Sequence, residues 1–177
     1  MGRNVMKNKE MTILGVVIAI NLVLSNIVRL PTPTGFVSLV EVGIFIAAWQ
    51  FGPRGGAIVG GITGILLDLL AGYPQWMILS LIIHGSEGYL LGFSSETLAG
   101  KTKSMLAGGA VMVVGYWLGG AGLNWLMGGM EMQIKAALVA SAADMPANVL
   151  QVFVGFLLAL LINPAVSKII QQQHLES

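Results

Sequence analysis

Ionisable side chains interrupt several long apolar stretches, and these are the residues whose types and spacing could do chemistry. Four of them lie well inside such stretches: Glu41, Asp68, His84 and Glu87. A charged group within a bilayer is costly, so each of them suggests a functional site. His84 and Glu87 are three residues apart, which places them on one face of a helix. A carboxylate beside an imidazole can bind a cationic or hydrogen-bond-donating heterocycle, but it can equally be a structural pair or part of a proton path.

Aromatic and amide side chains in the last third of the chain would complement that pair. A planar, polar small molecule needs stacking faces together with a few placed hydrogen-bonding groups. We therefore predict that the following residues complete a substrate site with Glu87 and His84: Tyr116, Trp117, Asn124, Asn148 and Gln151. For Glu41 and Asp68 we favour structural roles. We expect Trp76 in the interfacial belt and Asp144 as a helix cap before Pro146.

Enzyme motifs are scarce. The chain has no cysteine, which excludes disulfides, thiol nucleophiles and cysteine metal sites. Gly100-Lys101-Thr102 has the end of a phosphate-binding loop, but Ser95 occupies the place of the first glycine. Neither a His-Glu-x-x-His pair nor a Gly-x-Ser-x-Gly elbow is present. We predict no catalytic residues, no metal, no cofactor and no ATP hydrolysis by this chain, and its net charge of +1 argues against a nucleic-acid partner.

The elements that must position these residues are membrane helices. Hydrophobic residues make up 55% of the chain and charged residues only 10%, and the mean hydropathy is +0.82. A helix needs about 20 residues to cross the hydrocarbon core. We predict an all-α, integral membrane six-helix bundle with helices over residues 11–30, 36–51, 57–71, 75–93, 105–127 and 144–162. Residues 130–143 are mildly apolar and could form an interfacial loop helix.

The basic residues predict the orientation. With the N-terminus inside, the inner segments would hold Arg3, Lys7, Lys9, Arg54, Lys101, Lys103 and Lys168. The outer loops would hold only Arg29 and Lys135, so both termini are expected in the cytoplasm, in a multi-pass protein of the cell membrane. We divide the chain into a cytoplasmic segment (1–10), the bundle (11–164) and a cytoplasmic tail (165–177) whose last residues resemble an added tag.

Small residues recur with helical spacing. Gly56, Gly60 and Gly64 lie four apart, and Gly15 and Ala19 repeat this spacing in the first helix. Such residues let two helices approach closely in lipid. Packing within the bundle is the favoured interpretation at any one site, and docking of a partner protein is the alternative.

Several blocks of the sequence resemble one family. They are Leu39-Val-Glu-Val-Gly43, Phe51-Gly-Pro-Arg-Gly-Gly56, His84-Gly-Ser-Glu-Gly88 and Asp144-Met-Pro-Ala-Asn148. Together they are similar to the substrate-binding (S) components of energy-coupling factor (ECF) transporters. The resemblance implies a six-helix subunit that captures a vitamin from outside the cell. It also implies docking on a membrane coupling subunit (EcfT-like) that is driven by two cytoplasmic ATPases.

The resemblance also implies residue roles. Gly15 and Ala19 match the family's docking face on the first helix. In thiamine-binding members a glutamate of the fourth helix contacts the aminopyrimidine and an asparagine of the sixth helix helps, and Glu87 and Asn148 match these positions. We therefore expect hydroxymethylpyrimidine or thiamine as the ligand, with pyridoxine-type B6 vitamers next. Riboflavin, folate, pantothenate and biotin stay open.

Two other classes of protein compete with this interpretation. A stand-alone proton- or ion-coupled transporter would use the buried acids and the imidazole as a proton relay. Such transporters are usually longer and built from two related halves, and no convincing internal repeat is present here. A membrane enzyme would need a dense polar cluster or a nucleotide or metal motif.

Overall fold

The computed structural model describes residues 8–33, 35–128 and 133–175. Its elements are α1 (Asn8–Ile27), β1 (Arg29–Pro31), β2 (Phe36–Ser38), α2 (Val40–Ala71), the 3₁₀ helix η1 (Pro74–Trp76), α3 (Met77–Leu91), α4 (Leu98–Met127), α5 (Ile134–Ala142) and α6 (Met145–Leu175). The predicted helical fold is confirmed, with a two-stranded hairpin added. In the described residues, four helices are long and apolar enough to cross a membrane, so six spanning helices are not confirmed.

The two helices predicted on either side of residues 52–56 are both present and meet at a sharp kink within the element labelled α2. Its only non-helical residue is Gly52, with φ 68° and ψ −164°, a backbone conformation that essentially only glycine adopts. Pro53 follows, and proline is accepted in the first turn of a helix. The chain folds back here: a Cβ built on Gly56 would lie 2.8 Å from the Ala48 Cβ, whereas eight residues of straight helix span about 12 Å.

Three other helix boundaries differ from the prediction. α1 ends at Ile27 because residues 29–31 pair with residues 36–38, with Arg29 opposite Ser38. α4 begins at Leu98, not at 105, because Thr97 Oγ1 caps it by accepting from the Gly100 N–H at 3.1 Å. α6 does not stop before Pro164 but continues to Leu175, since neighbouring groups in a membrane bundle can compensate for the hydrogen bond that proline removes.

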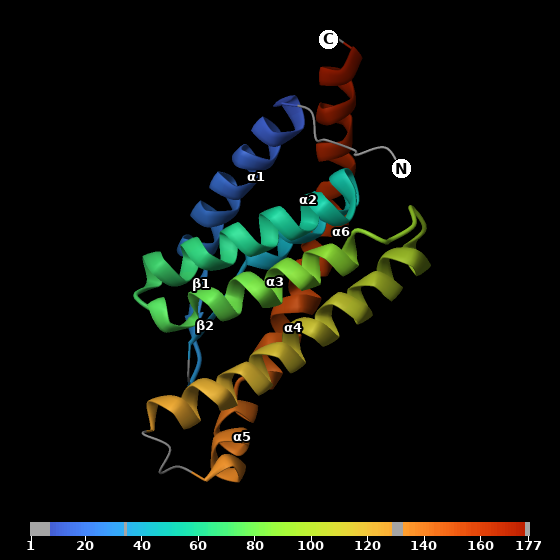
Figure 1. Ribbon diagram of the computed structural model, residues 1–177. Coiled ribbons are helices and arrows are strands. Elements are labelled where there is room, and N and C mark those ends of the chain that lie inside the picture. The colour runs from blue at the N-terminus through green and yellow to red at the C-terminus, as the bar shows by residue number, and fades with distance from the viewer. Residues whose placement is uncertain (1–7, 34, 129–132, 176–177) are drawn as a thin grey trace, which may run out of the picture.

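The predicted loop helix between the last two spans is present as α5, although residues 129–132 lie outside the described part of the chain. In Figure 1 α1 begins and α6 ends at the same end of the bundle. Termini on one side of a membrane require this arrangement. Their cytoplasmic location stays a prediction.

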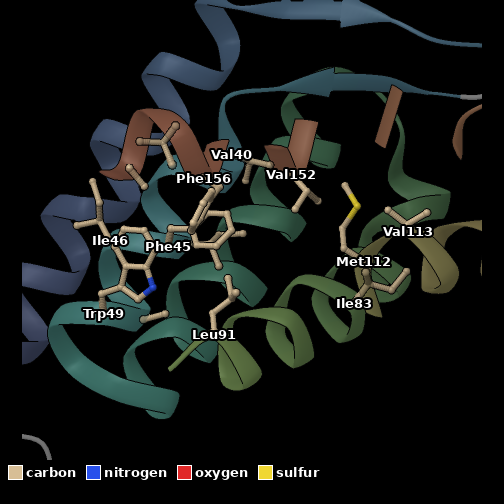
Figure 2. Close-up of a cluster of buried hydrophobic side chains, with 14 of the residues drawn as sticks. Val40, Phe45, Ile46, Trp49, Ile83, Leu91, Met112, Val113, Val152 and Phe156 are labelled. Atoms are coloured by element: carbon tan, nitrogen blue, oxygen red, sulfur yellow. The ribbon is translucent and has the colours of Figure 1, made fainter. Parts of the chain in front are cut away.

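An aromatic cluster forms the centre of the apolar core (Figure 2). The Phe45 ring centroid lies 5.4 Å from that of Trp49 and 5.6 Å from that of Phe156, so the two α2 residues pack directly on α6. Other large apolar side chains point outward, among them Ile78 and Leu161, at 72% and 77% exposed. An apolar exterior of this kind suits a lipid environment.

Glycines bring α3 against α2. A Cβ on Gly56 would overlap the Gly88 carbonyl, and one on Gly60 would overlap the His84 carbonyl. At Gly64 the nearest atom would be the Ser80 carbonyl oxygen, at 3.0 Å. The packing interpretation of this glycine row is therefore confirmed.

Candidate functional site

A cavity lies between the hairpin and the helices α2, α3, α4 and α6. The empty space inside it, including the open mouth, is about 630 Å³. Polar and aromatic side chains dominate its wall: Thr32, Ser38, Asp68, Ser80, His84, Asp144, Asn148, Gln151, Phe36, Tyr73, Trp76 and Tyr116. The wall includes three acidic or basic side chains, and none of the lining residues is lysine or arginine.

A buried cluster of three side chains closes one side of this cavity. The Nδ1 atom of His84 lies 2.9 Å from Glu87 Oε2 and 3.7 Å from Glu41 Oε1. Both glutamates are fully buried and His84 is 4% exposed. His84 lines the cavity, whereas the two glutamates lie behind the ring.

The fold positions this cluster through close helix packing and one amide. Gly60 lets α3 approach α2 at His84, and Glu41 stands in the first turn of α2. Gln151 on α6 donates from Nε2 to Glu41 Oε1 at 2.9 Å and accepts the Ser38 N–H at 2.6 Å. One side chain thus connects the hairpin, α2 and α6.

The carboxylates at the site have unused hydrogen-bonding capacity. Glu41 Oε2, Glu87 Oε1 and Asp68 Oδ2 are buried and have no hydrogen-bond partner among the described residues. A buried polar atom without a partner costs about 1–3 kcal/mol. The site is therefore suited to a ligand or a proton that supplies donors.

The same three residues of the cluster could hold a metal ion, since Glu41, His84 and Glu87 offer ligand atoms within 4.8 Å of one another. The 2.9 Å contact between His84 and Glu87 is also an ordinary hydrogen-bond length. Because a hydrogen bond accounts for the contact between His84 and Glu87, we interpret the cluster as a hydrogen-bonded group without a metal ion.

Aromatic rings extend the wall next to His84. The Tyr116 ring lies 5.4 Å from the His84 ring and 5.9 Å from the Trp76 ring, centroid to centroid. Tyr116 OH also makes a 2.7 Å hydrogen bond with Ser80 Oγ. Trp76, which we expected in the interfacial belt, lines the cavity. Asp144 lines it too, and it stands directly before α6, where its carbonyl accepts the Asn148 N–H at 3.0 Å, the position expected of a helix cap.

The structure brings together most of the predicted substrate residues. His84, Tyr116, Asn148 and Gln151 line the cavity, and Glu87 lies directly behind His84.

Trp117 and Asn124 do not reach the cavity. Trp117 Nε1 donates to the Leu138 carbonyl at 2.9 Å, and Asn124 Nδ2 donates to Ser141 Oγ at 3.0 Å. Both side chains hold α5 against α4, and ligand contact by either one stays a prediction.

Sequence reasoning missed several residues of the site. Glu41 and Asp68 carried a signal, because both are acids within apolar stretches, but structural roles were favoured. Phe36 and Tyr73, whose ring centroids are 5.7 Å apart, carried none, since their contact depends on the hairpin.

Comparison with known proteins identifies the family. The family model described as the ECF-type riboflavin transporter, S component, matches residues 5–168. The thiamine precursor transporter HmpT of Lactococcus lactis subsp. cremoris (strain MG1363) is 36% identical over 163 residues, which cover 90% of this chain and 89% of HmpT. An uncharacterized protein of Pyrococcus woesei is 36% identical over 95 residues, which cover 51% of this chain and 64% of that protein. The chain belongs to the family of S components of ECF-type transporters.

Proposed function

We propose that this chain is the high-affinity substrate-binding subunit of an ECF-type importer and that its ligand is hydroxymethylpyrimidine or thiamine, with pyridoxine-type B6 vitamers next. The observation that carries the proposal is a cavity whose wall combines aromatic rings with carboxylates and amides and lacks lysine and arginine. A relative named for a thiamine precursor covers nearly the whole chain and supports this choice of ligand.

The chemistry of the wall favours an aminopyrimidine. The planar ring can stack on Trp76 or Tyr116, and the exocyclic amine can donate to the oxygen atoms of Asp68 or Asn148. Folate, pantothenate and biotin carry carboxylates, which the acidic wall would repel. Riboflavin has no carboxylate and is named in the family description, so it is the principal competitor.

The exterior of α1 supports docking on a membrane coupling subunit with two cytoplasmic ATPases. Gly15 and Ala19 are exposed, and a Cβ on Gly15 would meet no described atom within 4 Å. Small residues on an exposed face allow another helix to approach closely. In this proposal the bundle binds the vitamin, reorients against the coupling subunit and releases the vitamin inside the cell.

A stand-alone transporter is the second candidate, and the buried cluster of Glu41, His84 and Glu87 favours it because such groups can relay protons. Uptake by the purified chain in liposomes without ATP separates the two. The ECF proposal predicts no net uptake by this chain alone.

Native mass spectrometry of the detergent-purified chain tests the proposal. We expect a co-purified pyrimidine at near-stoichiometric amount. Titration of ligand-free protein with hydroxymethylpyrimidine, thiamine, pyridoxine and riboflavin should give a nanomolar Kd for the true ligand, which corresponds to about 12 kcal/mol. Absence of saturable binding for all four would contradict the proposal, and preference for riboflavin would replace its ligand.

A further inference from the structure

The two nitrogens of the His84 ring have different surroundings. Nδ1 faces Glu87 Oε2 at 2.9 Å and Glu41 Oε1 at 3.7 Å, behind the cavity wall. Nε2 has no hydrogen-bond partner among the described residues. It is also not one of the fully buried unpaired atoms, so part of its surface is accessible. Since His84 lines the cavity, Nε2 is the ring atom available to a ligand.

The charge of the cluster limits where its protons reside. The titratable groups around the ring are Glu41 and Asp68 from α2, Glu87 from α3 and Tyr116 from α4, while α6 contributes the neutral Gln151. Among the residues that the structure describes, no lysine or arginine lines the cavity. A buried charge in a membrane protein is costly unless it is balanced. Two ionised glutamates and a neutral imidazole ring carry a net charge of −2. The cluster of Glu41, Glu87 and His84 is therefore neutral when it binds two further protons.

Two placements of these two protons leave a hydrogen on Nε2. If one proton is on a glutamate and one on the ring, the imidazolium carries N–H groups at both nitrogens. If both are on glutamates, the Glu87 O–H donates to Nδ1 across the 2.9 Å contact and the ring hydrogen is on Nε2. The remaining placement puts the ring hydrogen on Nδ1 and a proton between the Glu87 and Glu41 carboxyl groups, which are in contact, and it would leave Nε2 bare. The NMR experiment below separates this placement from the other two.

We infer that His84 presents an Nε2–H donor to the cavity and selects ligands with a hydrogen-bond acceptor at that point. Glu87 and Glu41 act through the ring as positioning residues. Asp68, whose Oδ2 atom is buried without a described partner, accepts from a donor group of the ligand. A ring nitrogen next to an exocyclic amine satisfies both requirements. This matching rests on the proposed function for the identity of the ligand; the Nε2–H group itself does not.

Nitrogen NMR of the full-length protein tests the donor directly. The chain has two histidines, so His174→Gln leaves His84 as the only labelled imidazole. We expect a one-bond N–H correlation at Nε2 at neutral pH in lipid nanodiscs. A bare, unprotonated Nε2 would overturn the inference, whatever ligand the protein binds.

Ligand analogues test the selection. Replacing the acceptor nitrogen of hydroxymethylpyrimidine by C–H should weaken binding by about 10- to 100-fold, so the two analogues with one or the other nitrogen replaced are compared with the parent. Equal binding of the parent and both analogues would overturn the selection but leave the proposed function in place. If no pyrimidine binds although Nε2 is protonated, the proposed ligand is wrong and the donor stands.

Discussion

Two helices pack on α2 in different ways, and the contrast separates binding from docking. α3 lies so close to α2 that Gly56 and Gly60 have no room for a Cβ, and it carries His84 and Glu87 of the site. On α1, by contrast, Gly15 and Ala19 are exposed, with open space around Gly15. The same four-residue spacing thus accompanies a rigid internal interface in one place and an uncovered face in another.

Polar residues show the same contrast. Asn21 on α1 is buried and paired within the protein: it donates to the Val40 carbonyl at 2.8 Å and accepts the Gly43 N–H at 3.3 Å. Glu41 and Glu87 each leave a buried oxygen without a described partner. Asn21 thus ties α1 to the start of α2, whereas the carboxylates beside the cavity keep oxygen atoms that a ligand or a proton can use.

The largest effect is expected at Gly60. In Gly60→Ala the new Cβ overlaps the His84 carbonyl, so α3 must move away and His84 moves with it. Overpacking of this kind costs about 1–3 kcal/mol, and we expect a lower Tm together with loss of ligand binding. Gly15→Ala is the matched control, because its Cβ meets no described atom within 4 Å. Equal Tm values for the two variants would contradict the contrast between α3 and α1.

The next largest effect is expected for Glu87→Gln. This substitution keeps the shape of the side chain and removes the carboxylate beside His84 Nδ1. We expect the Kd for hydroxymethylpyrimidine to rise by about 10- to 100-fold, measured by isothermal titration at matched folded protein. His174→Gln serves as the control. An unchanged Kd would show that the cluster is only structural.

On α1 the expected effect is confined to transport. Ala19→Leu places a bulky side chain on the exposed face, which should hinder docking of another helix. ATP-driven uptake by the assembled transporter should fall several-fold while the Kd of the isolated chain stays the same. Leu24→Met, at an exposed position on the opposite side of α1, is the control. If uptake by the two variants were the same, this face would not be the docking surface.

The smallest effect is expected for Asn21→Ala, which removes the two hydrogen bonds between the Asn21 side chain and the start of α2. The loss should be about 1–2 kcal/mol of stability, because two buried backbone groups lose a partner. Ligand affinity should change less than about two-fold, since Asn21 does not line the cavity. Thermal unfolding and titration of the same sample measure both, and a large loss of affinity would contradict the separation of α1 from the site.

The sequence was sufficient to predict helices and several polar residues of the site, because apolar length and buried charge are local signals. His84 and Glu87 are neighbours on one helix turn, so their contact followed from spacing alone. The bond between Ser38 and Gln151 joins residues 113 positions apart and depends on the whole fold.

The hairpin was harder to predict than the kink. Gly52 and Pro53 indicated the break in α2, and the structure has its non-helical residue at Gly52, with the helix resuming at once because proline is accepted in a first turn. The strands β1 and β2 have three residues each, too short for an alternating pattern. Without the hairpin, the aromatic wall at Phe36 and Tyr73 could not be foreseen.

The central claim is that the cavity beside His84 binds the vitamin. Equilibrium binding of radiolabelled hydroxymethylpyrimidine to the purified wild type and to His84→Gln, at matched amounts of folded protein, tests it most directly. We predict saturable, stoichiometric binding to the wild type and binding at least about 10-fold weaker to the variant. Equal affinity in both proteins, or no saturable binding to the wild type, would contradict the claim.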